Sequence, residues 1–334
     1  MAPETPPAPP ASSSALVTTV AGEVDPAVVD INVAYPGNDG GASGTGMILS
    51  STGVVLTNNH VVKGAASISI NVAGQSTTYP GKVLGVDPSA DVALVQMEGA
   101  ANLPTVTISS TPATVGQAVI AIGNALGKGG TPTVTAGSVT QLGETITATD
   151  FSGGSETLVD MMQTSAALAP GDSGGPLVNA NGAVEGMDTA AGGPSGGSGF
   201  SSTAFAIPIG RAIAIAQQIE QGQGSTEVLL QPTAVMGVLG VAPSQWDAQY
   251  GTIDPSLAEG AAVEIVESGS PAEAAGIVPG DIITTFAGQT VTSPTELEQL
   301  ETGYQPGATV SVGWVTSSGQ TETATLNLIA GPWA

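Results

Sequence analysis

Short apolar runs separated by turns dominate the first two hundred residues of the chain, and they restrict the fold more than any other feature. Six runs rich in Val and Ile precede Leu103, and six similar runs follow the turn-rich stretch at residues 109–114. Runs of this length are typical of strands, and their spacing, with 47 glycines in the chain, is typical of small closed barrels. We therefore predict a mainly β fold with two barrels side by side. The runs are Val28–Val33, Met47–Leu49, Val54–Thr57, Ile68–Val72, Val83–Val86, Val92–Met97, Val119–Ile122, Val139–Leu142, Met161–Thr164, Leu177–Val178, Val184–Met187 and Phe205–Ile207.

The end of the second set of runs predicts a helix. Pro208 stands before Ile209, Ile213, Ala216 and Ile219, which recur at helical spacing, and two glycines soon follow. Proline is favoured at the start of a helix and glycine just past its end. We expect this helix to complete the first large domain.

A separate module begins near Pro232. It contains two helix openings of one form, Ser270-Pro271-Ala272-Glu273 and Ser293-Pro294-Thr295-Glu296, in which Ser caps the helix and Glu caps it in return. Together with further strand signals, these openings predict a compact α/β module. The predicted organisation is a flexible Pro/Ser/Ala-rich tail at 1–22, a β domain at 23–224 and the α/β module at 232–330.

The charge balance excludes some classes of function. The net charge is −24, because the chain has 28 acidic residues and only four basic ones. So few Lys and Arg residues cannot form the basic patch that nucleic acid or an anionic membrane surface requires. With no Cys, the chain has neither disulfides nor a thiolate metal site. It also lacks an apolar run long enough for a membrane span, and its N-terminus does not read as a signal peptide.

The segment Pro170-Gly171-Asp172-Ser173-Gly174-Gly175 is the most specific chemical signal. Glycines on both sides of Ser173 permit a tight backbone turn in which the N–H groups of Gly171 and Ser173 converge on one point. Such donors stabilise the oxyanion of a tetrahedral intermediate, so we interpret this turn as a nucleophile with its oxyanion hole. The alternative is a Gly-rich turn whose Ser only caps a backbone group.

A serine hydroxyl needs a base, and His60 is the only histidine in the chain. Asp91 stands at the entrance to an apolar run, where a buried carboxylate requires a partner such as an imidazole N–H. Taken alone, His60 could be a packed or surface residue and Asp91 a turn residue. The chain order His60, Asp91, Ser173 is that of the chymotrypsin class of serine proteases.

With these residues in place, the chain resembles the HtrA (DegP-like) family of serine proteases, and most resembles the secreted PepA-like proteases of actinobacteria. The resemblance is carried by the segments TNNHVV, SADVALVQ, AIGN, PGDSGGPLVN and FAIPIG. It implies a chymotrypsin-like double β-barrel followed by a PDZ domain, and a secreted or cell-envelope location. It also implies cleavage of unfolded or misfolded proteins without ATP, metal or organic cofactor, and assembly into oligomers, commonly homotrimers.

Two segments are expected to border the primary specificity pocket. Ser165 and Ala204 stand where many relatives carry Asp and Gly, which puts substrate preference in doubt. Because the segment from Thr164 to Leu168 has no acidic residue, we expect a small or aliphatic P1 side chain in the substrate. The predicted pocket residues are Ala167, Leu168, Ala204, Phe205 and Ala206.

The C-terminal module contains Val235-Met236-Gly237-Val238, which resembles the loop of PDZ domains that binds a peptide C-terminal carboxylate. Leu297 and Leu300 are expected to form one wall of the groove. Residues 225–334 contain twelve acidic side chains and neither Lys nor Arg, so we expect weak peptide binding that salt strengthens. The alternative is a PDZ fold that acts as a packing or regulatory lid.

Two functions remain at this point. The first is an active serine endopeptidase regulated by its PDZ domain. The second is a proteolytically resting, chaperone-like or peptide-binding protein, because a displaced turn from Gly171 to Ser173 would abolish the oxyanion hole with every catalytic residue present.

Overall fold

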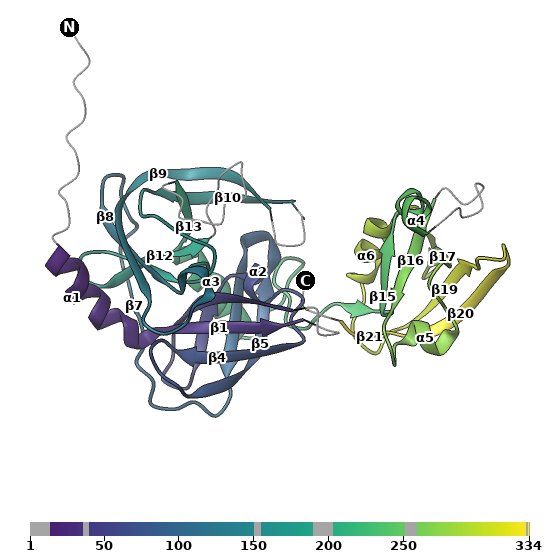
Figure 1. The fold of residues 1–334 in the computed structure, drawn as a ribbon, viewed down its shortest axis with the longest axis horizontal. Helices are drawn as coiled ribbons and strands as arrows, with labels where there is room; N and C mark the ends of the chain where they lie inside the picture. The colour runs from purple at the N-terminus through teal and green to yellow at the C-terminus, as the bar shows by residue number, and fades with distance from the viewer. Residues whose placement is uncertain are drawn as a thin grey trace, which may run out of the picture. The chain divides into compact units, whose positions relative to one another are not determined.

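The chain forms two units in the computed structural model, residues 1–230 with residue 334, and residues 231–333 (Figure 1). Each unit has its own buried core. The structure describes residues 14–35, 40–149, 155–189, 203–250, 259–331 and 333.

Helix α1 (Ser14–Val24) begins the described part of the N-terminal unit. The tail predicted for residues 1–22 is therefore wrong for residues 14–22. Val20, Ala21 and Val24 recur at helical spacing and are buried in the main core cluster, where α1 contacts β8 and β9. The Pro-rich start of the chain obscured this stripe, which gains its stability from packing on the barrel. Residues 1–13 lie outside the described residues.

The first barrel is closed, with strand order β1-β2-β3-β6-β5-β4, and all its neighbouring strands are antiparallel. Each of the six apolar runs predicted before Leu103 overlaps one of its strands. The strands are β1 (Val28–Ala34), β2 (Gly41–Ile48), β3 (Val54–Thr57), β4 (Ser67–Val72), β5 (Thr78–Asp87) and β6 (Val92–Met97).

The second barrel follows the order β11-β8-β9-β10-β13-β12, and an additional pairing of β11 with β12 closes the ring. Strand β7 pairs with β12 in parallel at one side. The second set of predicted runs overlaps β8 to β13, so the mainly β double-barrel prediction is confirmed. The strands are β7 (Thr107–Ile108), β8 (Ala118–Gly123), β9 (Thr133–Thr149), β10 (Ser155–Thr164), β11 (Pro176–Val178), β12 (Ala183–Thr189) and β13 (Ala204–Pro208).

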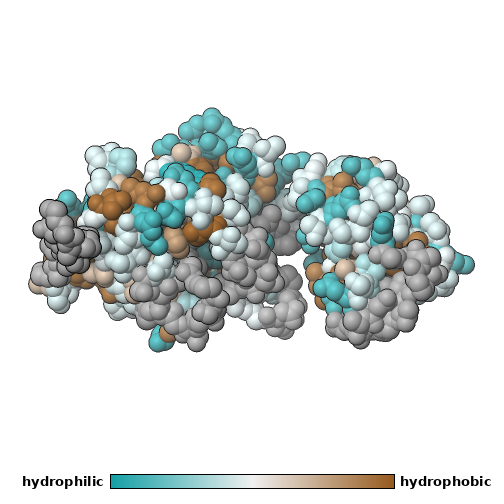
Figure 2. All heavy atoms as spheres, turned by 90° about the horizontal axis from the view of Figure 1, so that it is seen from above, coloured by the Kyte–Doolittle hydropathy of each residue, from teal (hydrophilic) through white to brown (hydrophobic). Residues whose placement is uncertain are grey.

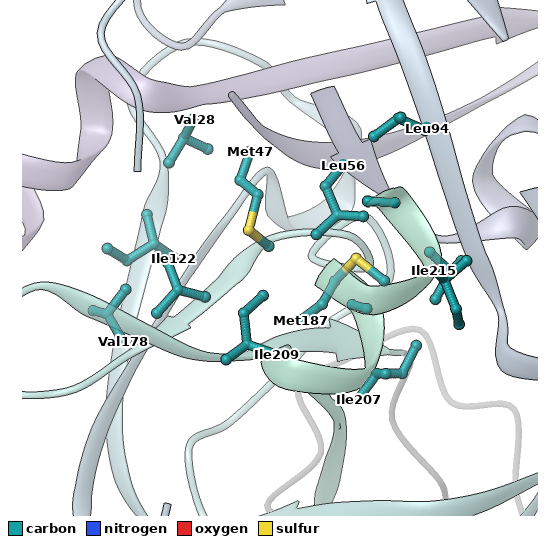
Figure 3. Packing of buried hydrophobic residues seen from close by; sticks show 14 of the residues in the cluster. Val28, Met47, Leu56, Leu94, Ile122, Val178, Met187, Ile207, Ile209 and Ile215 are labelled. Carbon is teal, nitrogen blue, oxygen red and sulfur yellow. The ribbon is translucent and has the colours of Figure 1, made fainter. Parts of the chain in front are cut away.

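One apolar cluster joins the two barrels to helix α3 (Ile209–Glu220), which begins directly after Pro208 as predicted. Figure 3 shows Met47 of β2 and Leu56 of β3 on one side of this cluster, with Met187 of β12 and Ile209 of α3 facing them. These side chains are buried, with at most 5% exposed. The shared core therefore holds the two barrels in one fixed arrangement.

The C-terminal unit contains a main sheet of order β15-β16-β17-β19-β20, in which β18 pairs with β17, and a separate two-stranded pair of β14 with β21. Helices α5 and α6 begin with the predicted caps, since the hydroxyls of Ser270 and Ser293 accept the N–H groups of Glu273 and Glu296, both at 3.1 Å. The elements are β14 (Ala234–Val235), β15 (Val238–Val241), α4 (Pro243–Tyr250), β16 (Ala261–Val266), α5 (Pro271–Ala275), β17 (Ile282–Phe286), β18 (Gln289–Thr290), α6 (Pro294–Glu301), β19 (Thr309–Val315), β20 (Thr321–Asn327) and β21 (Ile329–Ala330).

Apolar and hydrophilic residues are interspersed on the face of each unit that Figure 2 shows. Among the described residues, no helix has the length and apolar character needed to cross a membrane.

Candidate active site

His60 and Asp91 meet in the first barrel. His60 lies in the short helix α2 (Asn59–Val62), directly after β3, and Asp91 lies between the 3₁₀ turn at residues 88–90 and β6. His60 Nδ1 lies 2.9 Å from Asp91 Oδ2 and 3.1 Å from Oδ1, and the His60 backbone N–H donates to Oδ1 at 3.0 Å. Asp91 therefore holds both the ring and the main chain of His60.

The backbone around Asp91 aims its carboxylate at the histidine. Asp87 caps the 3₁₀ turn by accepting the Ala90 N–H at 3.0 Å, and Asp91 then takes a left-handed conformation with φ 54°. Asp tolerates this conformation better than most residues. The side chain of Asp91 is only 2% exposed, so its hydrogen bonds must compensate for lost water.

Two polar residues that the sequence reasoning missed complete this network. Thr189, at the end of β12, donates its hydroxyl to Asp91 Oδ2 at 3.1 Å. Asn58 donates its side-chain amide to Thr189 Oγ1 at 2.6 Å and to the Asp91 carbonyl at 3.0 Å. Both residues are buried. The sequence shows each of them as a polar residue at the end of an apolar run. It does not show that they meet, because Asn58 belongs to the first barrel and Thr189 to the second.

The turn that carries Ser173 is fastened to both barrels. Thr45 N–H of β2 donates to the Ser173 carbonyl at 2.8 Å, and Gly174 N–H donates to the Asp188 carbonyl at 2.8 Å. A Cβ on Gly174 would lie 2.1 Å from the Thr45 carbonyl oxygen and 2.3 Å from Thr57 Oγ1, so only glycine fits. Because Thr57 precedes His60 by three residues, the Ser173 turn packs against the segment that carries the histidine.

Gly171 has the geometry expected of an oxyanion-hole residue. Its φ is +99°, and a Cβ there would lie 2.3 Å from the Asn124 carbonyl oxygen. Leu126 N–H donates to the Pro170 carbonyl at 2.6 Å. A trans peptide places its C=O and N–H on opposite sides, so the Gly171 N–H points away from Leu126. Within the described part of the chain, neither this N–H nor that of Ser173 is paired with a protein acceptor.

Two buried carboxyl groups lie behind the Ser173 turn. Asp172 Oδ2 accepts the Ala169 N–H at 2.9 Å, which supports the turn, while its other oxygen and both carboxyl oxygens of Asp188 have no partner among the described residues. Burial raises the pKa of Asp172 to about 6. Burial, reinforced by the nearby Asp172, raises the pKa of Asp188 well above its usual range. Asp188 was missed because its position behind Ser173 depends on strand pairing.

The predicted pocket residues come from two segments that the second barrel brings together. Ala204, Ala206 and Leu168 belong to one apolar cluster with at most 1% exposure, and the Ala167 carbonyl accepts Thr135 Oγ1 at 2.7 Å. Phe205 lies in the other cluster, between the barrels. Residues 190–202 lie outside the described residues.

Ser165, one of the two departures from the resembled family, is turned toward the main chain. Its hydroxyl accepts the Ser138 N–H at 3.0 Å. The segments 164–169 and 203–206 carry no charged side chain.

The predicted peptide loop lies at an open sheet edge in the C-terminal unit. Val235 ends β14, Gly237 has φ +81°, and Val238 begins β15, the first strand of the main sheet. Met236 is fully buried.

Helix α6 runs antiparallel to β15. Its first residue, Pro294, lies 3.5 Å from the place of a Cβ on Gly240, and its last, Glu301, accepts the Met236 N–H at 2.9 Å. Of the predicted wall residues, Leu300 is partly buried, and Leu297, with 3% exposure, belongs to the core.

Comparison with known proteins identifies both units. The family Trypsin-like peptidase domain matches residues 44–187, and the family PDZ domain matches residues 237–328. A solved structure, the HtrA-type protease AlgW with tripeptide, is 30% identical, with a TM-score of 0.54, and the match covers 94% of this chain and 96% of that one. The chain belongs to the HtrA family of serine proteases.

Curated relatives of this HtrA protein are also similar in sequence. Serine protease PepD of Mycobacterium tuberculosis is 33% identical over 93% of this chain and 66% of its own length. The Probable periplasmic serine protease do/HhoA-like of Haemophilus influenzae is 39% identical over 76% of this chain and 51% of its own length. The chain therefore spans about half to two thirds of these relatives. The resemblance to HtrA proteases and the trypsin-like fold with one PDZ domain are confirmed.

Proposed function

We propose that this HtrA-family chain is a serine endopeptidase in which Ser173 is the nucleophile, His60 the base and Asp91 the partner of the base. The observation that carries the proposal is the hydrogen-bonded path from His60 Nδ1 through Asp91 to Thr189 of β12, because the carbonyl of the preceding strand residue, Asp188, accepts the Gly174 N–H and fixes the turn after Ser173. This link ties the base in the first barrel to the nucleophile turn on the second.

The proposed chemistry follows from these contacts. Asp91 binds Nδ1 of His60, which makes Nε2 the ring nitrogen that accepts the proton of Ser173 Oγ during attack on the substrate carbonyl. The N–H groups of Gly171 and Ser173 stabilise the oxyanion that forms. His60 then gives the proton to the leaving amine. Water, activated in the same way, hydrolyses the acyl-enzyme and restores Ser173.

The orientation of the Pro170–Gly171 peptide supports an assembled site over the resting alternative. In a displaced turn the Pro170 carbonyl would face the hole, but here it accepts the Leu126 N–H at 2.6 Å. No step of the proposed chemistry uses a metal or an organic cofactor. The described residues contain no cluster of three or more His, Asp or Glu suited to a metal ion.

Substrate, location and assembly are part of the proposal. Unfolded or misfolded polypeptides with a small or aliphatic P1 residue fit the uncharged segments 164–169 and 203–206, and the PDZ unit supplies a second site for peptide. A secreted or cell-envelope location is supported by relatives described as periplasmic. The homotrimer and the absence of nucleic-acid binding stay predictions.

Intact-mass analysis after treatment with a fluorophosphonate tests the proposal. We expect one adduct on the native chain and none on Ser173→Ala. Ser318→Ala, in an exposed turn of the C-terminal unit, is the matched variant and should label normally. Equal labelling of the native chain and Ser173→Ala, or none of the native chain, would contradict an assembled Ser173 site.

A further inference from the structure

Glu301 of α6 contacts the loop that precedes β15. Its Oε1 accepts the backbone N–H of Met236 at 2.9 Å, and the residue is only 8% exposed. This contact closes one end of the space between β15 and α6. Among the described strands, β15 pairs with β16 alone, so its other edge has unpaired main-chain groups.

The Met236 N–H belongs to the loop 235–238, whose successive N–H groups are the donors expected for a peptide C-terminal carboxylate. A carboxyl of the chain itself already occupies this donor. An incoming carboxylate would have to displace Glu301 or bind with fewer donors. Displacement would leave a buried acidic group without its hydrogen bond, which is costly.

Negative charge near the loop 235–238 also disfavours an incoming carboxylate. Burial, reinforced by Glu298 on the same helix and opposed by the hydrogen bond from the Met236 N–H, raises the pKa of Glu301 to about 7. Glu267, from the segment between β16 and α5, faces the loop as well, since its Oε2 lies 3.5 Å from the place of a Cβ on Gly237. Tyr304, just past α6, packs against the same core. Residues 225–334 contain no Lys or Arg to balance these acids.

We propose that this groove selects extended apolar segments that lack a C-terminal carboxylate, such as internal stretches of an unfolded chain, and that Glu301 excludes the free carboxylate. The proposal rests on the peptide capture proposed above and corrects its expected ligand. Glu301 does not weaken the binding of a segment without a carboxylate, because such a segment pairs with the unpaired edge of β15 through main-chain hydrogen bonds. Val238 and Leu300, both partly buried, then offer it apolar contact.

The pH dependence has a definite sign. Glu301 gains a proton as the pH falls through about 7, and the repulsion it exerts on a ligand carboxylate then disappears. A peptide carboxylate stays ionised over this range. Acidification should therefore improve binding of a free-acid peptide relative to its amide, and only while residue 301 can titrate.

Fluorescence anisotropy with one labelled peptide in two forms tests the proposal. The probe is an N-terminally labelled hexapeptide of alternating Ser and Val that ends in Val, as the free acid and as the C-terminal amide. All proteins are full-length and carry Ser173→Ala to prevent cleavage. At about pH 8 we expect the amide to bind about tenfold more tightly than the acid, and the ratio to approach one near pH 6.

Three variants separate the effect of the negative charge of Glu301 from that of its hydrogen bond with the Met236 N–H. Glu301→Gln keeps an acceptor for the Met236 N–H but removes the charge, so the preference for the amide should fall by about tenfold and lose its pH dependence. Glu301→Ala frees the donor and should favour the free acid. Glu298→Gln removes the same charge from the same helix without touching the loop, and should shift the ratio by less than about threefold.

Three results would overturn the proposal. If the protein that retains Glu301 bound the free acid more tightly than the amide at pH 8, Glu301 would not exclude the carboxylate, although peptide capture would stand. If Glu301→Gln and Glu298→Gln changed the preference for the amide equally, that preference would come from the net negative charge of the unit and not from Glu301 at the loop. Binding of neither peptide to any variant would overturn both this inference and the proposed peptide capture, whereas the fluorophosphonate experiment judges the endopeptidase separately.

Discussion

Replacing Asp188 by Asn should stabilise the N-terminal unit at neutral pH. Asp188 is 0% exposed, and its carboxyl oxygens have no partner among the described residues. Because burial raises its pKa well above the usual range, the folded chain keeps a proton that the unfolded chain releases near pH 4. The folded state binds more protons above that pH, so its stability falls as the pH rises.

The size of the effect follows from this proton. Each pH unit between the unfolded-state pKa near 4 and the raised folded-state pKa lowers the free energy of unfolding by about 1.4 kcal/mol. Asn carries no such proton, although its buried amide lacks partners and costs about 1 to 2 kcal/mol. We therefore expect the stability of Asp188→Asn relative to the native chain to increase from about pH 4 upward, by about 1.4 kcal/mol for each pH unit until the folded-state pKa is reached.

The assay is urea unfolding followed by far-UV circular dichroism at several pH values. Tryptophan fluorescence serves as an internal control, because Trp246, Trp314 and Trp333 all lie in the C-terminal unit and should report an unchanged transition. Asp160→Asn removes an exposed carboxyl of β10 and is the matched variant. A gain that does not depend on pH, or none at pH 7, would refute the reasoning.

Three further predictions concern the proposed triad and the N-terminal helix. Asp91→Asn should lower kcat about ten-thousand-fold, because the imidazole of His60 loses the partner that orients it; a peptide-cleavage assay yielding less than a tenfold loss would contradict that role. Thr189→Val should lower kcat about tenfold with little change in KM, since Asp91 loses a hydrogen bond, and an unchanged kcat would count against it. Val20→Asp should destabilise the N-terminal unit by about 3 kcal/mol, measured by circular dichroism, because α1 would bury an unpaired charge; a variant as stable as the native chain would show that α1 does not pack there.

The strands and helix caps were predictable because their signals are local. Val92–Met97 reads as a strand from its composition, and it forms β6 with the same bounds. The Ser293 cap of α6 depends only on residues within one turn of helix. By contrast, β9 extends far beyond the predicted run at Val139–Leu142, because its polar residues gain stability from pairing with β10 and not from burial.

The boundary of the N-terminal tail was wrong for a similar reason. The apolar stripe of α1 includes small residues such as Ala21, and it forms a helix because the barrel covers it. Isolated helices of this length are marginal in water. Composition near a chain end therefore underestimates structure that packing supplies.

The sequence alone determined the residue types of the proposed chemistry, since a single histidine, the segment Gly171-Asp172-Ser173-Gly174-Gly175 and an aspartate in the right order leave few alternatives. Tertiary structure decided everything that depends on contact between distant segments. Thr189 reaches Asp91 across 98 positions, and Glu301 reaches Met236 across 65. The physical reason is that hydrogen bonds and burial act over a few ångströms in space, whatever the separation of the partners along the chain.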